Sequence, residues 1–288
     1  MRRRPLALAV LATAALAVSA CAPQESSTGS AASGSSGGGS CTPEDLPTVA
    51  SDTLTIATDT PAYEPWFVDD DPTNGEGYES AVAYAVAEQL GYDRDQVEWT
   101  SVQFNAAITP GDKDFDVDIN QFTITDERRQ AVDFSSPYYT ATQAVITTAG
   151  SPAAGATSIA DLKGLRIGAQ VATTSLTALT DQIAPDAGPV VFNTNDDAKL
   201  ALQNGQVDAI VVDLPTAFYI TGAELDDGVV VGQLEGSTGG DEYGLLLAKD
   251  SPLTDCVTQA VDALDSDGTL AALQEQWLSE AADAPVLN

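Results

Sequence analysis

Short apolar runs alternate with amphipathic segments along most of this chain, and this alternation restricts the fold more than any other feature. Thr53–Thr58 alternates apolar and polar residues like a strand, and Glu79–Leu90 places its apolar residues on one helical stripe before Gly91. The order of the elements predicts an α/β architecture. Further strands are expected at 96–102, 116–119, 143–148, 165–169, 207–212 and 243–248, and further helices at 173–183, 196–203, 253–264 and 269–278.

The segment Asp116–Tyr139 carries the strongest functional signal. A short buried strand, Asp116–Ile119, is expected to break into a polar loop and then a helix capped by Thr125. In open α/β sheets, ligands bind where strands end and helix N-termini offer free N–H groups. Arg128, one turn into that helix, suits a ligand carboxylate. The alternative is an exposed helix start whose arginine pairs only with the neighbouring acids.

Polar residues also follow four of the predicted strands. Turn positions explain any one of them, but together with Arg128 they supply both signs of charge. Arg128 suits a carboxylate, and Asp213 suits an ammonium group. The strand-end residues are Asp59, Asn120, Gln121, Gln170 and Asp213, accompanied by the N–H groups of Thr173 and Thr174, the hydroxyl of Thr123 and the rings of Tyr63, Trp66 and Phe104.

The N-terminal segment indicates export. Residues 1–20 contain three arginines and then an apolar run too short to span a bilayer, which is typical of a signal peptide. Small residues before Cys21 look like a lipoprotein lipobox, which implies cleavage there and a lipid on the thiol. An ordinary signal peptide with an incidental cysteine is the alternative. The Ser/Gly-rich segment that follows Cys21 is expected to be a flexible tether. The lipidated Cys21 and this tether together form a linker over residues 21–51.

Charge and cysteine content limit the partners and the compartment. The chain has 43 acidic residues, 11 basic residues and no histidine, so nucleic acid and anionic lipid surfaces are poor partners. With Cys21 lipidated, Cys41 and Cys256 remain. In an exported chain two cysteines suggest one disulfide, although two unrelated buried thiols are the alternative.

Several motifs, in order and spacing, resemble the solute-binding proteins of polar amino-acid ABC transporters, solute-binding family 3, which have the type II periplasmic fold. The resemblance covers roughly Thr53–Leu278. It rests on LTIATD, the aromatic pair Tyr63 and Trp66, the GYE sequence at Gly77, TITDERRQAVDFSSPYY, LKGLRIGAQVATTS, GQVDAIVVD, the EYG sequence at Glu242, and DGTLAALQEQWL.

The resemblance implies a role for each matching residue. Arg128 would clamp the ligand α-carboxylate with help from Thr173 and Thr174, and Asp213 would bind the α-ammonium group. Tyr63 and Phe104 would sandwich the ligand. Thr123 and the backbone of Gln121 would bind its ammonium group. Asp59 and Gln170 would face its side chain. Gln121 stands where the family has Gly or Ala, and Ala172 replaces a frequent glycine.

The resemblance also implies the domain organisation. We expect two lobes, each a mixed, mostly parallel sheet flanked by helices, with residues 52–145 and 235–288 in the first and 146–234 in the second. The lobes would be joined by strands near 144–147 and 231–234. The protein would be a monomer, held by Cys21 at the outer face of the bacterial cell membrane, that passes its ligand to a membrane permease.

No catalytic residue, cofactor or metal site is expected. Because Asp59 accepts hydrogen bonds and no second basic residue falls on a matched contact position, a polar neutral or basic amino acid is favoured over glutamate. Two other functions use the same fold: a ligand-binding component of a sensor and an exported dehydratase. The dehydratase would need a carboxylate such as Glu64 or Asp59 as its base, because the chain has no histidine.

Overall fold

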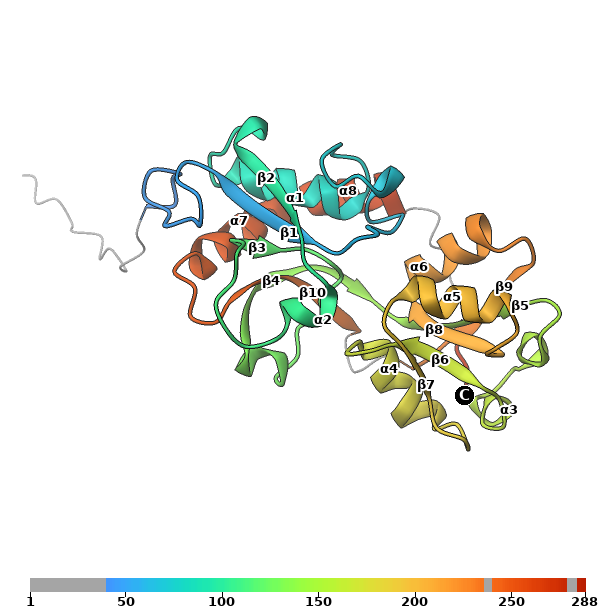
Figure 1. The fold of residues 1–288 in the computed structure, drawn as a ribbon. Coiled ribbons are helices and arrows are strands. Elements are labelled where there is room, and N and C mark those ends of the chain that lie inside the picture. Colours follow the sequence, from blue (N-terminus) through green and yellow to red (C-terminus); the bar gives the residue numbers. More distant parts are fainter. Residues whose placement is uncertain (1–39, 236–239, 279–283) are drawn as a thin grey trace, which may run out of the picture. The chain divides into compact units, whose positions relative to one another are not determined.

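A computed structural model describes residues 40–235, 240–278 and 284–288. Within residues 40–288 the strands form two five-stranded sheets, in the orders β2-β1-β3-β10-β4 and β7-β6-β8-β5-β9 (Figure 1). Each sheet with its helices is called a lobe below, the first lobe holding β1 and the second holding β6. The α/β architecture with two mixed sheets, predicted from the sequence, is confirmed.

The first sheet is parallel on one side and antiparallel on the other. Strand β1 pairs in parallel with both β2 and β3, whereas β10 runs antiparallel to β3 and β4. The carboxyl ends of β1 and β3 therefore meet at one edge. The strands are β1 Leu54–Thr58, β2 Val97–Ser101, β3 Val117–Asp118, β4 Val132–Ala141 and β10 Asp241–Ala248.

Helices cover both faces of the first sheet. The larger core packs α1, α7 and α8 against the buried side chains of Leu54 and Ile56, and the opposite face packs α2 over Ala57 and Leu246. The helices are α1 Tyr78–Gln89, α2 Phe104–Ala107, α7 Thr254–Ser266 and α8 Thr269–Leu278, with single turns at Val68–Asp70, Arg94–Gln96 and Arg128–Gln130.

Gly77 fixes the start of α1. Its φ is +94°, and a Cβ there would lie 2.4 Å from the carbonyl oxygen of Trp66. Only glycine combines this backbone conformation with so close an approach. The N-terminus of α1, including Glu79, is thereby held close to the ends of β1 and β3.

The second sheet has the same mixed organisation. Strand β6 is parallel to β7 and β8, and β5 is antiparallel to β8 and β9. Its two faces are covered by α3 and α4 on one side and by α5 and α6 on the other. The elements are β5 Gln143–Thr148, α3 Ile159–Leu162, β6 Ile167–Gln170, α4 Thr174–Ala178, β7 Val190–Phe192, α5 Asn195–Gln203, β8 Ala209–Asp213, α6 Leu214–Tyr219 and β9 Gly228–Gln233, with single turns at Pro152–Gly155, Leu179–Ile183 and Ile220–Glu224.

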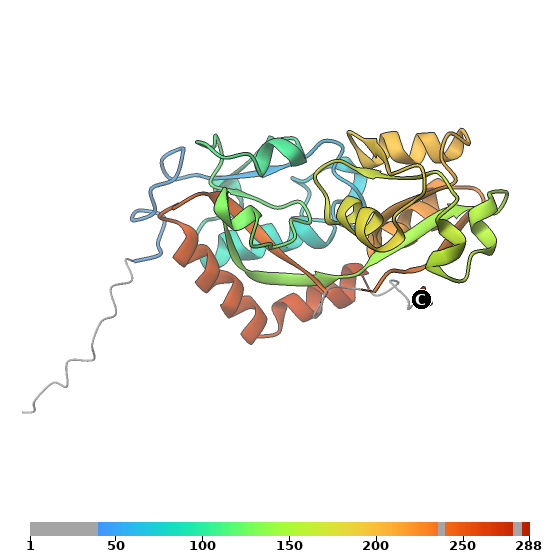
Figure 2. The same cartoon turned by 90° about the horizontal axis from the view of Figure 1, so that it is seen from below.

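The chain passes between the sheets at two crossings. Strand β4 of the first sheet leads through Thr142 into β5 of the second, and β9 leads back to β10 (Figure 2). The crossings lie at the ends of β5 and β9, whereas the sequence analysis placed them within these strands, near 144–147 and 231–234. It also placed the lobe boundary at 146, although all of β5 belongs to the second sheet. The boundary was misplaced because β4 and β5 follow each other with a single residue between them.

The last five residues correct the domain prediction further. Val286 forms a parallel bridge with Gln233, and the buried Leu287 joins the core of the second lobe. The amide of Gln233 donates to the carbonyl of Pro285 at 2.8 Å. Residues 284–288 therefore pack on the second lobe, although the sequence analysis assigned 235–288 to the first. A single apolar pair at a chain end has too little pattern to predict a strand.

The chain packs against the first lobe from Cys41 onward. Cys41 and Cys256 form the expected disulfide, with Cα atoms 5.5 Å apart. Leu46 is buried, and the amide of Val49 donates to Asp116 at 2.8 Å. The linker predicted for 21–51 is therefore too long at its C-terminal end. The signal peptide and Cys21 lie outside the described residues, and within the described residues no helix is long and apolar enough to cross a membrane.

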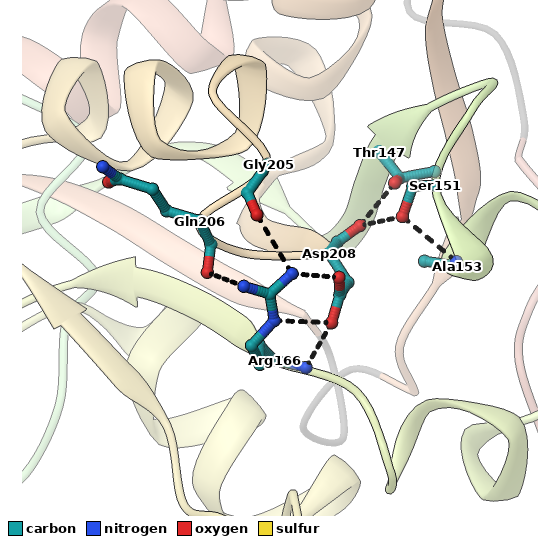
Figure 3. A network of polar contacts seen from close by, with 7 residues as sticks. All are labelled: Thr147, Ser151, Ala153, Arg166, Gly205, Gln206 and Asp208. Carbon is teal, nitrogen blue, oxygen red and sulfur yellow. Dashed lines mark hydrogen bonds and ion pairs between the residues drawn. The ribbon is translucent and has the colours of Figure 1, made fainter.

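An arginine network ties together the N-terminal ends of β6 and β8 (Figure 3). Arg166 contacts both carboxylate oxygens of Asp208, with Nη2 at 2.6 Å from Oδ1, and donates to the carbonyls of Gly205 and Gln206. The carbonyl of Asp208 accepts hydrogen bonds from Thr147 and Ser151. This network holds the N-terminal ends of β6 and β8, at the edge of the sheet opposite their carboxyl ends. It therefore stabilises the sheet and is not placed at the edge where ligands bind.

Two local predictions around Arg128 need correction. The helix expected after Thr125 is a single turn, Arg128–Gln130, although the hydroxyl of Thr125 does accept the amide of Arg128 at 3.1 Å. The chain then enters β4, which the sequence analysis did not predict. Pro137 lies inside this strand beside an irregularity in its pairing with β10, and a proline argues against a strand when only the sequence is read.

Candidate functional site

Polar residues at the strand ends surround a small cavity of about 30 Å³ between the lobes. Most of them lie at or just beyond the carboxyl ends of β1 and β3 in the first lobe and of β6 and β8 in the second, while Phe104 opens α2 and Asn195 opens α5. All of the predicted ligand-binding residues except Thr123 line it. The lining residues are Asp59, Tyr63, Phe104, Asn120, Gln121 and Arg128 from the first lobe and Gln170, Thr173, Thr174, Ser175, Asn195 and Asp213 from the second.

Arg128 lies at the centre of this arrangement and bonds to both lobes. Its Nη1 donates to the carbonyl of Thr123 at 2.7 Å, and its Nη2 donates to the carbonyl of Ala172 at 2.9 Å. The side chain is buried, with its guanidinium carbon 5.4 Å from the centre of the Phe104 ring. Burial lowers the pKa of Arg128, while the charges of Asp213 and Asp241 oppose that shift. The guanidinium remains a cation aimed at the cavity.

Ala172 has the backbone conformation that a glycine would favour. Its φ is +64°, and its carbonyl is the acceptor from Arg128. The frequent glycine of the resembling family is thus replaced by a residue that adopts a left-handed conformation at a cost of roughly 1 kcal/mol. The strain is tolerated because the loop presents this carbonyl across the interface.

Asp213 supplies the negative charge on the other side of the cavity. It follows β8, and its Oδ1 accepts a hydrogen bond of 2.6 Å from the side-chain amide of Gln143. Burial raises the pKa of Asp213 to about 6; the charge of Asp241 adds to the shift, and the hydrogen bonds and Arg128 oppose it. Asp213 is therefore ionised at neutral pH and becomes protonated in mildly acidic solution.

Gln143 connects Asp213 to Thr174, Asp241 and Ser175. Its amide nitrogen also donates to Asp241 at 2.7 Å, and its amide oxygen accepts the hydroxyl of Ser175 at 2.6 Å. Because Asp241 begins β10 in the first lobe, this single side chain bonds carboxylates from both lobes. The sequence analysis did not assign Gln143 to the site, since a glutamine opening an apolar strand carries no distinguishing signal.

The loop between β6 and α4 positions the remaining second-lobe contacts. The hydroxyl of Thr173 donates to the carbonyl of Gln170 at 2.7 Å and accepts the amide of Leu176 at 3.1 Å, so it caps α4. The hydroxyls of Thr174 and Thr123 lie 3.1 Å apart across the lobes. Thr123 therefore contacts the second lobe beside the cavity instead of lining it.

Aromatic side chains form part of the first-lobe wall. Phe104 stacks on Phe122, with ring centres 4.7 Å apart. Asp59 holds Phe104 in place by accepting its backbone amide at 3.0 Å. Tyr63 reaches the second lobe, where its hydroxyl accepts the amide of Asp196 at 3.3 Å. Trp66, by contrast, is fully buried in the core, and its indole nitrogen donates to Thr216.

Gln121 is held by a buried glutamate that the sequence analysis did not place in the site. Glu79 accepts the backbone amide of Gln121 at 2.7 Å, and it also accepts the side-chain amide of Gln121 and the hydroxyl of Tyr138. Burial raises the pKa of Glu79 to about 7, although these hydrogen bonds oppose the shift. Gln121 has a φ of +48°, so Glu79 stabilises both its unusual backbone and its side chain.

Two cavity residues of the second lobe were also missed. Asn195 begins α5, and Ser175 lies one residue beyond the predicted pair Thr173 and Thr174. The extension to Ser175 follows from the turn of α4. Asn195 is the first residue of α5, after the N-cap Thr194, and a single polar residue at a helix start has no sequence context that marks it as functional.

Comparison with known proteins identifies a matching family. The model of the bacterial extracellular solute-binding proteins, family 3, matches residues 54–280. The L-arginine-binding protein of Pseudomonas aeruginosa is 28% identical over 242 residues, which cover 81% of this chain and 91% of that protein.

Solved structures give the same result. The arginine-, lysine- and histidine-binding protein ArtJ of Geobacillus stearothermophilus is 28% identical with a TM-score of 0.66, and the match covers 79% of this chain and 96% of that one. An ancestral amino-acid-binding protein, described as a precursor of cyclohexadienyl dehydratase, is 30% identical with a TM-score of 0.63, and its match covers 78% of this chain and 95% of that one.

Proposed function

Because this chain belongs to the bacterial extracellular solute-binding proteins of family 3, we propose that it captures a polar amino acid, neutral or basic, between its lobes. It then delivers this amino acid to the permease of an ABC importer. The observation that carries the proposal is the placement of Arg128 and Asp213 around one cavity. A free amino acid has one carboxylate and one ammonium group, and these two side chains match that pair.

The roles of the lining residues follow from their donors and acceptors. Arg128 and the start of α4 at Thr173 and Thr174 bind the α-carboxylate. Asp213 and the backbone carbonyl of Gln121 bind the α-ammonium group. The hydroxyl of Thr123, which lies beside the cavity and contacts Thr174, joins them when the ligand separates this pair. The ligand side chain lies between Tyr63 and Phe104, toward Asp59 and Gln170.

The residues that line the cavity where the ligand side chain would lie support a neutral or basic ligand. Asp59, Asn120 and Gln121 all offer acceptor oxygens, and Arg128 is the one basic residue among the lining residues. A second carboxylate on the ligand would face Asp59 without a cation to balance it. The relatives that bind arginine, lysine or histidine agree with this preference.

Entry of the ligand requires the lobes to separate. A cavity of about 30 Å³ holds one or two water molecules at most, far less than an amino acid. The crossing at Thr142, between β4 and β5, is a segment about which the lobes hinge. Contacts that join the lobes, such as Arg128 with Ala172 and Trp66 with Thr216, form on closure.

The same proposal includes the cellular setting. A lipid on Cys21 holds the protein, as a monomer, at the outer face of the cell membrane. The experiment for this part is the Cys21→Ser variant, which is expected to appear in the medium instead of the membrane fraction. If it remains with the membranes, the anchor is elsewhere.

An exported dehydratase is the less favoured alternative. General-base chemistry needs a carboxylate free to accept a proton. Glu79, with its raised pKa, accepts three hydrogen bonds, and Asp59 accepts the amides of Thr60 and Phe104. Both carboxylates are thus engaged in hydrogen bonds that support the fold, and neither is free to act as a general base. A sensor component would bind its ligand in the same way, and loss of amino-acid uptake on gene deletion distinguishes transport from sensing.

Calorimetric titration with a panel of amino acids tests the function. Glutamine, arginine and lysine are the probes for a neutral or basic preference, and glutamate is the acidic control. Tight binding of one of the first three is expected. Tight binding of glutamate with no response to the other three would contradict the preference, and no binding of any amino acid would contradict the function itself.

A further inference from the structure

Asp118 is a buried acid for which the fold gives no structural use. Its side chain is 0% exposed on β3, and among the described residues neither carboxylate oxygen makes a well-formed hydrogen bond, although the backbone amide of Ile119 favours its ionised form. Buried polar groups are almost always paired, because an unpaired one loses its hydration without replacement. Asp116, two residues earlier, shows the usual arrangement, since it accepts the amides of Val49 and Thr55.

The register of the sheet places Asp118 directly below the cavity. Its neighbours across the strands are Ala57 and Leu246, which belong to the apolar cluster that contains Phe104. Side chains in register point to the same face of a sheet, so Asp118 lies on the side that Phe104 covers. Phe104 in turn lines the cavity.

Asp59 and Asn120 connect this buried position to the ligand. Asp59 lies just beyond the end of β1 and Asn120 just beyond the end of β3, each two residues after the in-register pair Ala57 and Asp118. Two residues of extended chain span about 7 Å. Asp118 is therefore a second acidic residue below the side-chain end of the cavity, where Asp59 is the first.

The charges around Asp118 come from three elements. Burial raises the pKa of Asp118 well above its usual range, and the charges of Glu79 from α1 and Asp59 after β1 raise it further, while Lys113 lowers it. These causes favour the protonated form of Asp118 when no cation is near. A cation brought near it would favour the ionised form and release that proton.

Lys113 does not already serve as this cation. Its ammonium group donates to the carbonyl of Thr109 at 2.5 Å, and the described residues contain no ion pair between Lys113 and Asp118. Burial lowers the pKa of Lys113, although the charge of Asp118 raises it, so Lys113 and Asp118 interact through space without forming an ion pair. The charge of Asp118 is thus left for a group that enters the cavity.

We propose that Asp118 is a specificity-determining residue that favours a ligand side chain ending in a cation over a neutral side chain of the same length. This inference rests on the proposed function and narrows it to basic amino acids. Asp118 acts through space, by attraction across Asp59 and Phe104, and does not touch the ligand.

Arginine and citrulline are the matched probes, because they share length and α-groups and differ in the charge at the end of the side chain. The ratio of their two dissociation constants is compared, because protonation of Asp213 and of the ligand amino group affects both ligands equally and cancels in the ratio. In the wild type at neutral pH, arginine is expected to bind about tenfold more tightly than citrulline, because the guanidinium favours the ionised form of Asp118. In Asp118→Asn this preference is expected to be several-fold lower.

Asp114→Asn is the control, because it removes the same charge from an exposed position on the same segment; it is expected to behave like the wild type. The inference is wrong if Asp118→Asn keeps the wild-type preference, if citrulline binds as tightly as arginine to the wild type, or if only other amino acids bind. Should Asp118→Asn fail to fold, equal binding of arginine and citrulline by the wild type still overturns it. Absence of binding by every amino acid would instead contradict the proposed function.

Discussion

Arg128 and Ala172 belong to different lobes, and Nη2 of Arg128 donates a hydrogen bond of 2.9 Å to the carbonyl of Ala172. The cation proposed to hold the ligand carboxylate therefore also joins the lobes. A ligand carboxylate that replaces the carbonyl of Ala172 as the partner of Arg128 would still join the lobes. It would contact Arg128 of the first lobe and the start of α4, at Thr173 and Thr174 of the second lobe, which line the same cavity as Arg128. Ligand capture and closure are thus linked through one side chain.

The pH dependence of binding is the first prediction. The pKa of Asp213 is raised to about 6, so acidification through this value removes the negative charge that holds the ligand ammonium group. Affinity is expected to fall by roughly tenfold for each unit below pH 6. Titration calorimetry between about pH 5 and 8 measures this fall. An Asp213→Asn variant that binds as tightly as the wild type at neutral pH would contradict it.

Stability should change with pH in the opposite direction. The pKa of Glu79 is raised to about 7 in the folded protein, so the folded state binds a proton more tightly than the unfolded chain. This contribution is fully present below the unfolded pKa and is lost as pH rises through about 7. From the shift, the loss is about 3 kcal/mol.

The melting temperature of the unliganded protein measures this loss of stability with rising pH. The wild type is expected to lose up to about 10 °C between about pH 5 and 8, and Glu79→Gln should lose much less. Glu76→Gln, an exposed neighbour, serves as the control and should follow the wild type. Identical curves for all three proteins would show that Glu79 does not titrate in this range.

Gln121→Gly tests the residue that departs from the resembling family. The change removes the strain of a φ of +48° but also removes the side-chain hydrogen bond to Glu79. These effects are each about 1 kcal/mol and of opposite sign, so the melting temperature should change little. The amino-acid preference should change clearly, since the Gln121 side chain lines the cavity.

Ala172→Gly is the matched control for Gln121→Gly. It relieves a similar backbone strain, at a φ of +64°, on the opposite lobe and without altering a polar side chain. We expect a slightly higher melting temperature and the wild-type order of ligands. An unchanged ligand order in Gln121→Gly as well would mean that its side chain does not contact the ligand.

The disulfide should stabilise the fold without affecting binding. It joins Cys41 to Cys256, 215 residues apart, and the chain-entropy account gives a loop of this length about 5 kcal/mol. Cys41→Ser is therefore expected to lower the melting temperature by about 10 °C and to leave the dissociation constant unchanged. Reduction of the wild type should give the same shift. No shift in either case would contradict a stabilising role for the bond.

Most of the site was predictable because strand ends gather in space. Asp59, Gln170 and Asp213 each follow an apolar run that forms a strand, and parallel strands bring their carboxyl ends to one edge. The chain positions of these residues therefore indicated their proximity. Arg128 was singled out for a similar reason, as an arginine that follows a polar loop.

Residues whose role depends on neighbours distant in sequence could not be predicted. Gln143 opens an apolar strand, and only the fold brings Asp213, Asp241 and Ser175 to it. Asp118 likewise alternates with Asp116 on one strand, and the sequence does not show that one is paired and the other is not.

Strand β4 and the C-terminal residues were missed for a different reason. Pro137 breaks the pattern that would otherwise indicate a strand, and β10 accommodates it with an irregular register. Leu287 is a single apolar residue whose burial depends on β9 and Gly232, where it packs against the glycine. Local pattern cannot report such contacts.

Replacement of Arg128 tests the central claim most directly. Arg128→Ala removes the charge-assisted hydrogen bonds proposed for the ligand carboxylate, and Arg129→Ala removes an adjacent exposed arginine as the control. Calorimetry with the best amino acid of the wild-type panel is expected to show a loss of at least about 100-fold for Arg128→Ala and none for Arg129→Ala, with both variants folded. Binding of Arg128→Ala within a few-fold of the wild type would contradict the account of the site.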